Sequence, residues 1–229
     1  WKESATAGFD IVTYTGTGSA TTVSHSLSAV PKMIFVKQRD EVRSWLVYNK
    51  TITATSWVHL DRNDAASANV AAWNNTEPTS SVFSVGTYND INKSDGEYVA
   101  YCFAEKQGFS KIGSYIGNGN ADGTFVYTGF RPAWIMVKKT NGTTNWQVID
   151  NKRSDAGGFN IVDKVLSPNA TDADYDEGSA TWIGDILSNG FKWRGSGWGA
   201  VNASGDTYIY MAFAEAPFVN SKGVPCNAR

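Results

Sequence analysis

The stretch Tyr98-Val-Ala-Tyr-Cys-Phe-Ala-Glu105 decides the fold class, because it is apolar or aromatic up to its final glutamate. Alternate residues of a strand point to opposite faces, so Val99, Tyr101 and Phe103 would share one face, and the other face is apolar as well. A strand that is apolar on both faces is expected in the middle of a covered sheet. The stretch returns as Tyr208-Ile-Tyr-Met-Ala-Phe-Ala-Glu215.

This return is part of an internal repeat of about 100 residues. Pro31-Lys-Met-Ile-Phe-Val-Lys37 matches Pro132-Ala-Trp-Ile-Met-Val-Lys138, and Tyr14-Thr-Gly-Thr-Gly18 matches Tyr115-Ile-Gly-Asn-Gly119, all at an offset of 101 residues. The offset reaches 110 at the final strand. The insertions therefore lie between the matched strands, where loops tolerate changes of length.

The composition favours strands over helices. The 229 residues include 19 Val and 12 Ile but only 5 Leu and 3 Met, and β-branched side chains pack well on strands. The only helix candidate is the Ala-rich stretch Asp64–Trp73. Short apolar runs alternate with turn residues, which predicts seven strands in the first repeat. They are Asp10–Gly16, Thr21–Ser26, Met33–Gln38, Ser44–Asn49, Ser56–Leu60, Val82–Gly86 and Tyr98–Ala104.

We therefore predict an all-β protein of two tandem duplicated antiparallel β-sandwich domains with a jelly-roll-like arrangement. The first domain would cover residues 8–107 and the second residues 108–218. Residues 1–7 would be a lead-in and residues 219–229 a tail. Since the sequence begins with Trp1 instead of Met, we expect a piece of a longer polypeptide.

Charge and apolar content exclude several classes of protein. The net charge is −2 without a basic patch, which argues against a nucleic-acid partner. No apolar run approaches the roughly 20 residues that a membrane-spanning helix needs, so membrane insertion is not expected. The two cysteines are too few for a disulfide framework, and we expect both Cys102 and Cys226 to be free thiols.

The repeated motifs resemble a repeat found in tail-fibre-like virion structural proteins of marine and other tailed bacteriophages. The resemblance covers both repeats and rests on Tyr-x-Gly-x-Gly, Pro-x-x-Ile-x-Val-Lys, an isolated Trp and the final strand, together with Ala216-Pro-Phe218 and the residues after it. It implies an extracellular β module near the distal end of a virion appendage. It implies no catalytic residues.

The candidate ligand-binding residues are Trp193, Arg194 and Trp198, because the two indoles flank a Gly-rich segment that reads as a loop. An exposed aromatic ring can stack on the C–H face of a sugar while nearby polar groups bind its hydroxyls. The alternative is packing in a core or a subunit contact, where Trp and Tyr are also enriched. We favour packing or a subunit contact over sugar binding for the tryptophans as a set.

Candidates for catalysis and metal binding are weak. A glycosidase needs two facing carboxylates, but the pairs Asp61 with Asp64 and Asp95 with Glu97 lie at strand ends beside turn residues. Neither His25 nor His59 has a nucleophile motif around it. Asp172, Asp174 and Asp176 alternate like the start of a calcium loop. The following glycine is one place late for an EF-hand, so a solvated acidic loop is the preferred interpretation. We expect no cofactor and no catalytic residue.

The sequence thus favours a structural and adhesive module of a bacteriophage tail fibre or similar virion appendage, extracellular when mature. Its partners would be further copies of the chain, other virion proteins and a host-surface polysaccharide. Two alternatives stay open at this point. One is a polysaccharide depolymerase, and the other is an assembly or capsid-decoration protein without a ligand.

Overall fold

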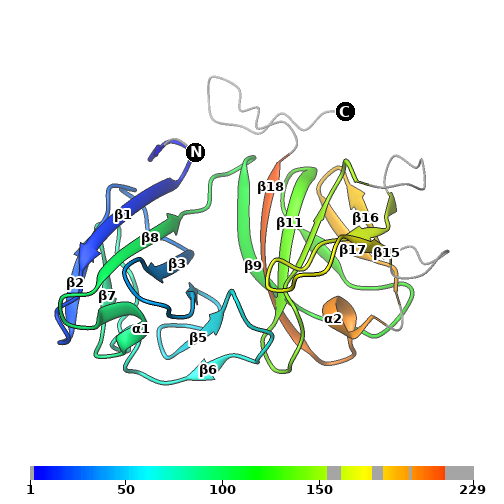
Figure 1. Ribbon diagram of the computed structural model, residues 1–229. Coiled ribbons are helices and arrows are strands. Elements are labelled where there is room, and N and C mark those ends of the chain that lie inside the picture. Colours follow the sequence, from blue (N-terminus) through cyan, green and yellow to red (C-terminus); the bar gives the residue numbers. More distant parts are fainter. Residues whose placement is uncertain (1–2, 154–160, 177–182, 196–197, 215–229) are drawn as a thin grey trace. The chain divides into compact units, whose positions relative to one another are not determined.

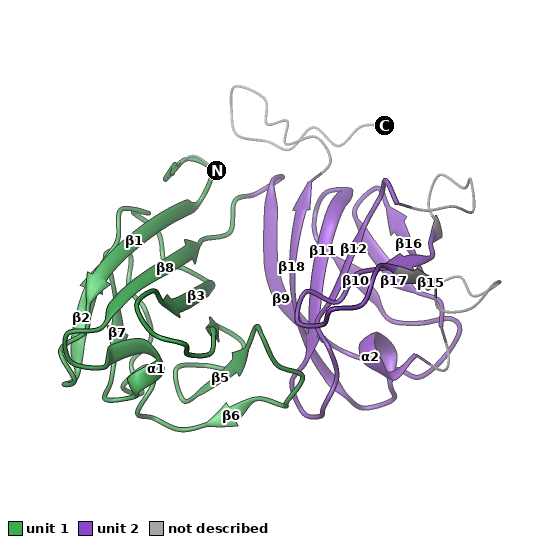
Figure 2. Ribbon diagram, in the orientation of Figure 1, with its two compact units in different colours: residues 1–106 green, residues 107–229 purple. Residues whose placement is uncertain are grey.

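The computed structural model describes residues 3–153, 161–176, 183–195 and 198–214 (Figure 1). Its elements are strands apart from two single-turn helices, so the predicted all-β class is confirmed. The chain divides into two compact units, Trp1–Lys106 and Gln107–Arg229 (Figure 2). Each unit contains several antiparallel sheets, which is compatible with a β-sandwich.

Unit 1 has one large sheet with the strand order β1-β8-β3-β4-β5-β6 and a second sheet of β2 and β7. The doubly apolar strand β8 lies between β1 and β3, as the sequence predicts (Figure 1). The elements are β1 (Phe9–Thr15), β2 (Thr21–Ser24), β3 (Met33–Gln38), β4 (Leu46–Asn49), β5 (Ser56–His59), β6 (Ser67–Ala68), β7 (Val82–Val85), α1 (Asn89–Asn92) and β8 (Glu97–Phe103).

The core of unit 1 lies between these two sheets. Val23 of β2 and Phe83 of β7 pack with Tyr98 and Ala100 of β8 in one buried cluster. The ring of Tyr14 stacks on that of Tyr98, with centroids 5.0 Å apart and an interplanar angle of 14°. All seven predicted strands of this unit are present, with ends that differ from the prediction by at most two residues.

Unit 2 has a sheet with the order β12-β11-β18-β9, another with the order β10-β17-β16-β13, and the pair β14-β15. Tyr115, Val126 and Phe191 belong to its buried cluster. The elements are β9 (Ser110–Ile116), β10 (Phe125–Tyr127), β11 (Pro132–Lys139), β12 (Gln147–Asp150), β13 (Ile161–Val162), β14 (Lys164–Val165), β15 (Tyr175–Asp176), β16 (Gly184–Leu187), β17 (Gly190–Trp193), α2 (Gly199–Asn202) and β18 (Thr207–Ala214).

The two units share a strand order. The run β1-β8-β3-β4 of unit 1 corresponds to β9-β18-β11-β12 of unit 2, and the pair β2-β7 corresponds to β10-β17. The registers agree as well, since Val23 faces Phe83 in one pair and Val126 faces Phe191 in the other. Gene duplication is our interpretation of this match.

A buried asparagine holds the Gly-x-Gly turn of unit 1. Asn92 is fully buried in α1, and its Oδ1 accepts a hydrogen bond from the Thr17 N–H at 2.8 Å. Its Nδ2 donates to the carbonyl oxygens of Ser19 at 2.7 Å and Gly86 at 2.5 Å. One side chain therefore joins the turn after β1, the end of β7 and α1, and satisfies buried polar groups that would otherwise be costly.

Asn202 of α2 does the same in unit 2. Its Oδ1 accepts from the Asn118 N–H at 3.1 Å, and its Nδ2 donates to the carbonyl oxygens of Asn120 at 3.0 Å and Gly195 at 3.3 Å. We call Asn92 and Asn202 the two clamp asparagines. They fix the turn that leads into β2 in unit 1 and into β10 in unit 2.

A tyrosine hydroxyl forms hydrogen bonds with the backbone at both ends of each short helix. Tyr98 accepts a hydrogen bond from the Lys93 N–H at 2.8 Å and donates to the Asn89 carbonyl oxygen at 2.6 Å. Tyr208 makes the corresponding two bonds around α2, and burial raises its pKa to about 12.

The helix predicted over Asp64–Trp73 is absent, so that prediction is wrong. The stretch contains strand β6 and turns. The carbonyl oxygens of Ala71 and Ala72 accept hydrogen bonds from Tyr88 and Gly86, so they pair with another segment and not with a helix of their own. Tertiary pairing has overridden the helix propensity of alanine.

Candidate functional site

Trp193 lies inside unit 2, so the expectation of an exposed indole at this position is wrong. It is the last residue of β17 and only 1% exposed. Phe191 and Trp193 are two residues apart on the strand and therefore point to the same side, which is the core. The Trp193 ring contacts those of Phe191, at a centroid distance of 5.4 Å, and Tyr115, at 6.2 Å. A ring enclosed in this way presents no face to a ligand.

Trp198 is half-buried and precedes α2 as its N-cap residue. Its ring packs edge-on against Trp193 at a centroid distance of 6.3 Å. Tyr88 holds the same position before α1 in unit 1, where it packs on Trp57 at 4.9 Å. The shared placement assigns Trp198 a packing role, which is the alternative that the sequence favours. Residues 196–197 between the two indoles lie outside the described part.

Arg194, the charged member of the three candidates, is half-buried and contacts one buried and one exposed carboxylate. Its Nε donates a hydrogen bond to Asp185 Oδ2 at 2.7 Å, and its Nη1 lies 3.5 Å from Asp122 Oδ1. Lys192 Nζ contacts the same Asp122 oxygen at 2.5 Å. The Lys192 ammonium group holds the pKa of Asp122 below its usual value, although this carboxylate is 81% exposed.

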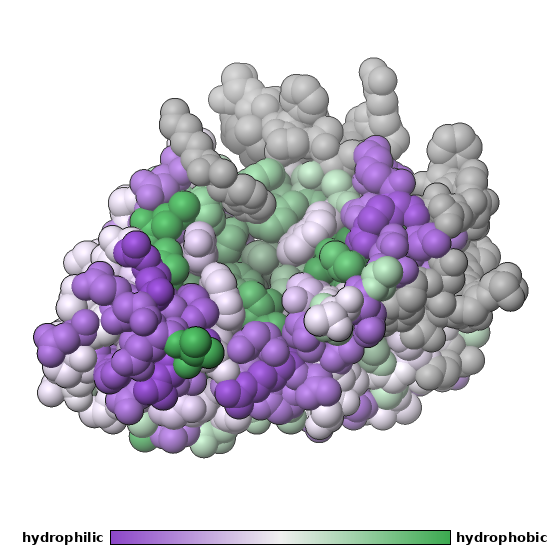
Figure 3. Space-filling model, in the orientation of Figure 1, coloured by the Kyte–Doolittle hydropathy of each residue, from purple (hydrophilic) through white to green (hydrophobic). Residues whose placement is uncertain are grey.

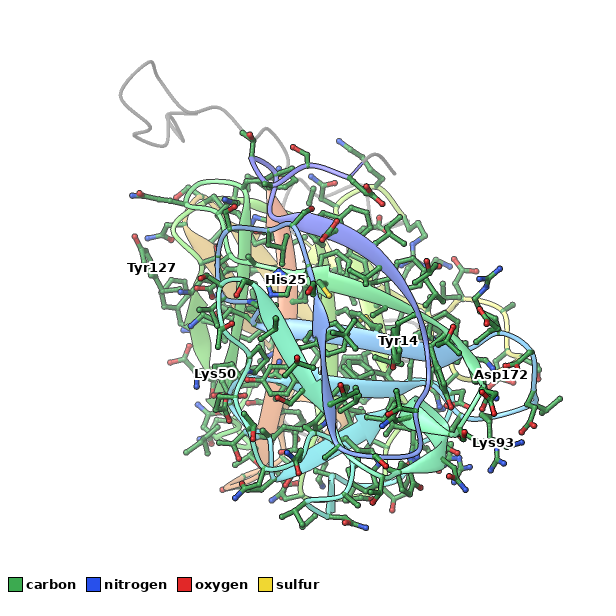
Figure 4. All side chains as sticks on the ribbon, turned by 90° about the vertical axis from the view of Figure 1, so that its left-hand side faces the viewer. Tyr14, His25, Lys50, Lys93, Tyr127 and Asp172 are labelled. Carbon is green, nitrogen blue, oxygen red and sulfur yellow. The ribbon has the colours of Figure 1, made fainter. Side chains whose placement is uncertain are left out.

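Strand β10, which pairs with β17, carries two exposed aromatic rings. Phe125 and Tyr127 are 44% and 63% exposed, whereas Val126 between them is buried in the core. Since side chains alternate along β10, both rings must point away from the core. The side chain of Tyr127, labelled in Figure 4, projects away from the ribbon. Phe125 lies opposite Lys192 in the β10-β17 register.

Gly190 makes room for the Phe125 ring. A side chain at this position would place its Cβ 2.9 Å from the Phe125 ring and 2.1 Å from the Val126 carbonyl oxygen. The absence of a side chain therefore lets the ring lie across β17. We define the outer face as the surface formed by Asp122, Phe125, Tyr127, Gly190, Lys192 and Arg194.

The described side chains show small apolar patches on a surface that is otherwise largely polar. In the view of Figure 3, hydrophilic residues cover much of the molecule and hydrophobic residues gather in limited areas. Large apolar side chains that are more than a third exposed are few among the described residues. They are Val30, Val42, Val70, Ile116, Phe125, Tyr127 and Leu166. Phe125 and Tyr127 are the aromatic members of this set.

The structure gives the acidic segment no metal site within its described residues. Asp172 and Asp174 are exposed, and Asp176 belongs to β15, where its backbone pairs with Lys164. In the parts of the chain that are described, no three His, Cys, Asp or Glu side chains lie close enough to hold a metal ion. Asp172 lies at the periphery in Figure 4.

The candidate acid and base groups of unit 1 have structural contacts. Asp61 accepts the Trp45 N–H at 3.0 Å, and the Asp64 carboxylate lies 3.1 Å from Nδ1 of the buried His59. Burial lowers the pKa of His25. Glu105 is half-buried, whereas its sequence match Glu215 lies outside the described residues, as does Cys226.

Cys102 is a buried thiol without a disulfide partner. Burial, with a smaller contribution from the Asp10 carboxylate, raises the pKa of this thiol. A protonated and enclosed thiol is a poor nucleophile. It belongs to the buried cluster of unit 1 and is therefore part of the packing.

Sequence reasoning missed Phe125, Tyr127 and the two clamp asparagines. The signal for the asparagines was available, because Asn92 and Asn202 fall on the same offset of 110 residues as the final strand. The signal for the rings lay in the repeat as well, since β10 carries aromatic residues where β2 carries Thr22 and Ser24.

Comparison with known proteins gives one match. The family model DUF7483, described as a domain of unknown function, matches residues 2–217. No curated protein and no solved structure matches the chain significantly. Among the described residues, no helix is long and apolar enough to cross a membrane.

Proposed function

We propose that this chain, which belongs to the DUF7483 family, is a structural and adhesive module that binds surface polysaccharide without cleaving it. The observation that carries the proposal is the outer face, where the two exposed aromatic rings of β10 share a surface with an exposed carboxylate and with two cationic groups at the end of β17. Rings and polar groups held on a sheet offer a sugar both stacking and hydrogen bonding.

The setting we propose is a bacteriophage tail fibre or similar virion appendage, with the chain extracellular in the mature particle. The motifs shared by the two units motivate this setting. Further copies of the chain and other virion proteins would be its assembly partners. Mass spectrometry of purified virions from a bacteriophage that encodes this chain should detect it among the structural proteins. Its absence from the particles would overturn the proposed virion setting.

Binding without chemistry is supported by what the candidate reactive groups do. Cys102 is buried, and the carboxylates of Asp61 and Asp64 are engaged by a backbone amide and by His59. These contacts stabilise the fold of unit 1 and leave such groups poorly placed for proton transfer to a substrate.

The test is to incubate the purified chain with bacterial envelope polysaccharides and to measure both retention of the protein and release of reducing ends. Retention without released sugar is expected. Release of oligosaccharide would overturn the non-catalytic assignment and favour a depolymerase. Absence of retention on every polysaccharide would overturn the adhesive assignment and favour an assembly protein without a ligand.

A further inference from the structure

The outer face of unit 2 differs from its counterpart in unit 1 at several positions at once. β10 and β2 hold the same place in the strand order, and their buried residues Val126 and Val23 face Phe191 and Phe83. On the side that faces away from the core, three residues of unit 2 are larger than their counterparts in unit 1, and one, a glycine, is smaller. Phe125 replaces Thr22, Tyr127 replaces Ser24, Gly190 replaces Val82 and Lys192 replaces Ser84.

An insertion in unit 2 adds the acidic group. Between the matched glycines Gly18 and Gly119 and the matched valines Val23 and Val126, the offset grows from 101 to 103 residues, and the two additional residues are Asp122 and Gly123. The Gly123 N–H donates to the Trp193 carbonyl oxygen at 3.0 Å, and a Cβ at position 123 would lie 2.4 Å from that oxygen. Gly123 thereby fixes the turn at the end of β17 and brings Asp122 to Lys192.

These differences are not needed for folding. Unit 1 builds the same strand pair around the same buried residues with Thr22 and Ser24 on the outside. Exposed aromatic rings carry a risk of aggregation that small polar residues avoid. Their presence on β10, where β2 has small polar residues, therefore needs a functional explanation. Relative to unit 1, the aromatic rings, Gly190 and the charged residues have changed together, and this favours a binding role for unit 2.

The chemistry of the outer face favours a saccharide over a protein partner. Charged residues are depleted at the centre of protein interfaces, whereas here Lys192 lies directly opposite Phe125. Sugars offer apolar C–H faces for the rings and hydroxyl groups for the charges. The exposed Asp122 carboxylate can accept hydrogen bonds from hydroxyls, and Lys192 can donate to them.

The charges of the outer face also select the class of saccharide. Lys192 and Arg194 are engaged by the carboxylates of Asp122 and Asp185, so the four charges balance. An acidic sugar would meet the exposed carboxylate of Asp122 and would have to displace it from the cations. A neutral sugar meets no such repulsion.

We infer that the outer face of unit 2 binds a neutral saccharide chain, with Phe125 and Tyr127 as the stacking platform and Asp122 and Lys192 as the hydroxyl-binding pair. This inference rests on the proposed function and assigns its ligand class and location. Unit 1 would contribute no saccharide site at the corresponding β2-β7 surface.

The test is affinity electrophoresis of the full chain in gels that contain dextran, mannan or galactan, with alginate as the acidic comparison. At least one neutral polymer should retard the chain, and alginate should retard it less. The double variant Phe125→Thr/Tyr127→Ser, which installs the residues of unit 1, should weaken binding at least about tenfold. Ile116→Thr and Val70→Ser remove other exposed apolar side chains and should bind like the unaltered chain.

Each outcome decides between the two proposals. If a neutral polymer retards the double variant and the unaltered chain equally, the assignment of the outer face is overturned while adhesion stands. If only alginate or other acidic polysaccharides are bound, the neutral class is overturned alone. If no polysaccharide of any kind is bound, both proposals fail.

Sedimentation analysis of the same double variant provides a second readout. An unchanged oligomeric state is expected, because the rings contact ligand and not another copy. A loss of oligomers would assign the outer face to a subunit contact and overturn the saccharide site. Matching circular dichroism spectra of variant and unaltered chain would show that the fold is retained, as expected for exposed positions.

Discussion

The strand pairs β2-β7 and β10-β17 agree on the side that faces the core and differ on the side that faces solvent. On the inner side, each pair places a valine opposite a phenylalanine, and each phenylalanine packs edge-on against a tyrosine of the neighbouring sheet. On the outer side, Thr22 and Ser24 correspond to Phe125 and Tyr127. The alternation of a strand thus separates two tasks, because one set of residues maintains the fold while the other is free to take up binding.

The largest expected loss of stability tests whether the two units depend equally on their clamp asparagines. Asn92→Ala and Asn202→Ala should each lower the free energy of unfolding by about 3 kcal/mol, because each leaves three backbone groups without their partner. Urea denaturation measures the loss. Thr22→Ala is a surface control and should stay within about 0.5 kcal/mol. A large loss for one asparagine and almost none for the other would break the correspondence between the units.

The next effect concerns the tyrosine that closes each helix. Tyr98→Phe and Tyr208→Phe remove one hydroxyl that both accepts and donates a hydrogen bond, so each should cost about 2 kcal/mol. Urea midpoints of the two variants should therefore shift by similar amounts. Retained stability in either variant would show that water replaces the hydroxyl there and would distinguish the two helices.

A pH-dependent effect is expected in unit 1 at Glu77. Its carboxylate accepts hydrogen bonds from the Tyr48 hydroxyl at 2.5 Å, Lys50 Nζ at 2.9 Å and the Ala54 N–H at 2.8 Å. Burial raises the pKa of Glu77, but these three bonds together outweigh it and hold the pKa below the ordinary value of 4.5. The stabilisation is therefore fully present above that value and is lost as the pH falls through the folded pKa.

Glu77→Gln should consequently cost about 1 kcal/mol at neutral pH, a modest value because the carboxylate is partly exposed and screened by solvent. The difference from the unaltered chain should shrink between about pH 5 and pH 3. Urea denaturation at several pH values measures it. A difference that stays constant with pH would mean that the Glu77 charge does not contribute to stability.

An equally small effect is expected at Cys102. In β8 it faces Ile34 of β3, and in β18 the corresponding Ala212 faces Ile135 of β11. Since alanine already fits this place in unit 2, Cys102→Ala should cost only about 1 kcal/mol. In a Cys226→Ser background, the Cys102 thiol should react with a thiol reagent only after denaturation. Fast reaction of the folded protein would contradict its burial.

Much of the fold could be predicted because the alternation of side chains is a local signal and the repeat shows it twice. Strand β3 was predicted to the residue, since Met33–Gln38 is bounded by a proline and by charged residues. The Asp64–Trp73 stretch was misjudged because its carbonyl oxygens pair with a segment that is distant in sequence. Pairings of that kind leave no periodicity in the stretch itself.

The candidate site was predicted only in part, through Arg194. Trp193 was placed wrongly because the end of β17 could not be located from a Gly-rich neighbourhood, and one position along a strand reverses the direction of a side chain. The exposure of Phe125 and Tyr127 could not be predicted, because a run of three apolar residues does not show which side chains face the core. The comparison of β10 with β2 shows it, because Thr22 and Ser24 are polar at the matching positions.

The pairing of the first and last strands has a mechanical consequence. In unit 1 the start of β1 lies opposite the end of β8, with Phe9 facing Phe103, and in unit 2 Ser110 lies opposite Phe213. A tensile load applied to the two ends of a unit would therefore peel this antiparallel ladder open one hydrogen bond after another instead of shearing all of them together. An appendage under tension would have to carry its load through contacts between subunits and not along the backbone of this chain.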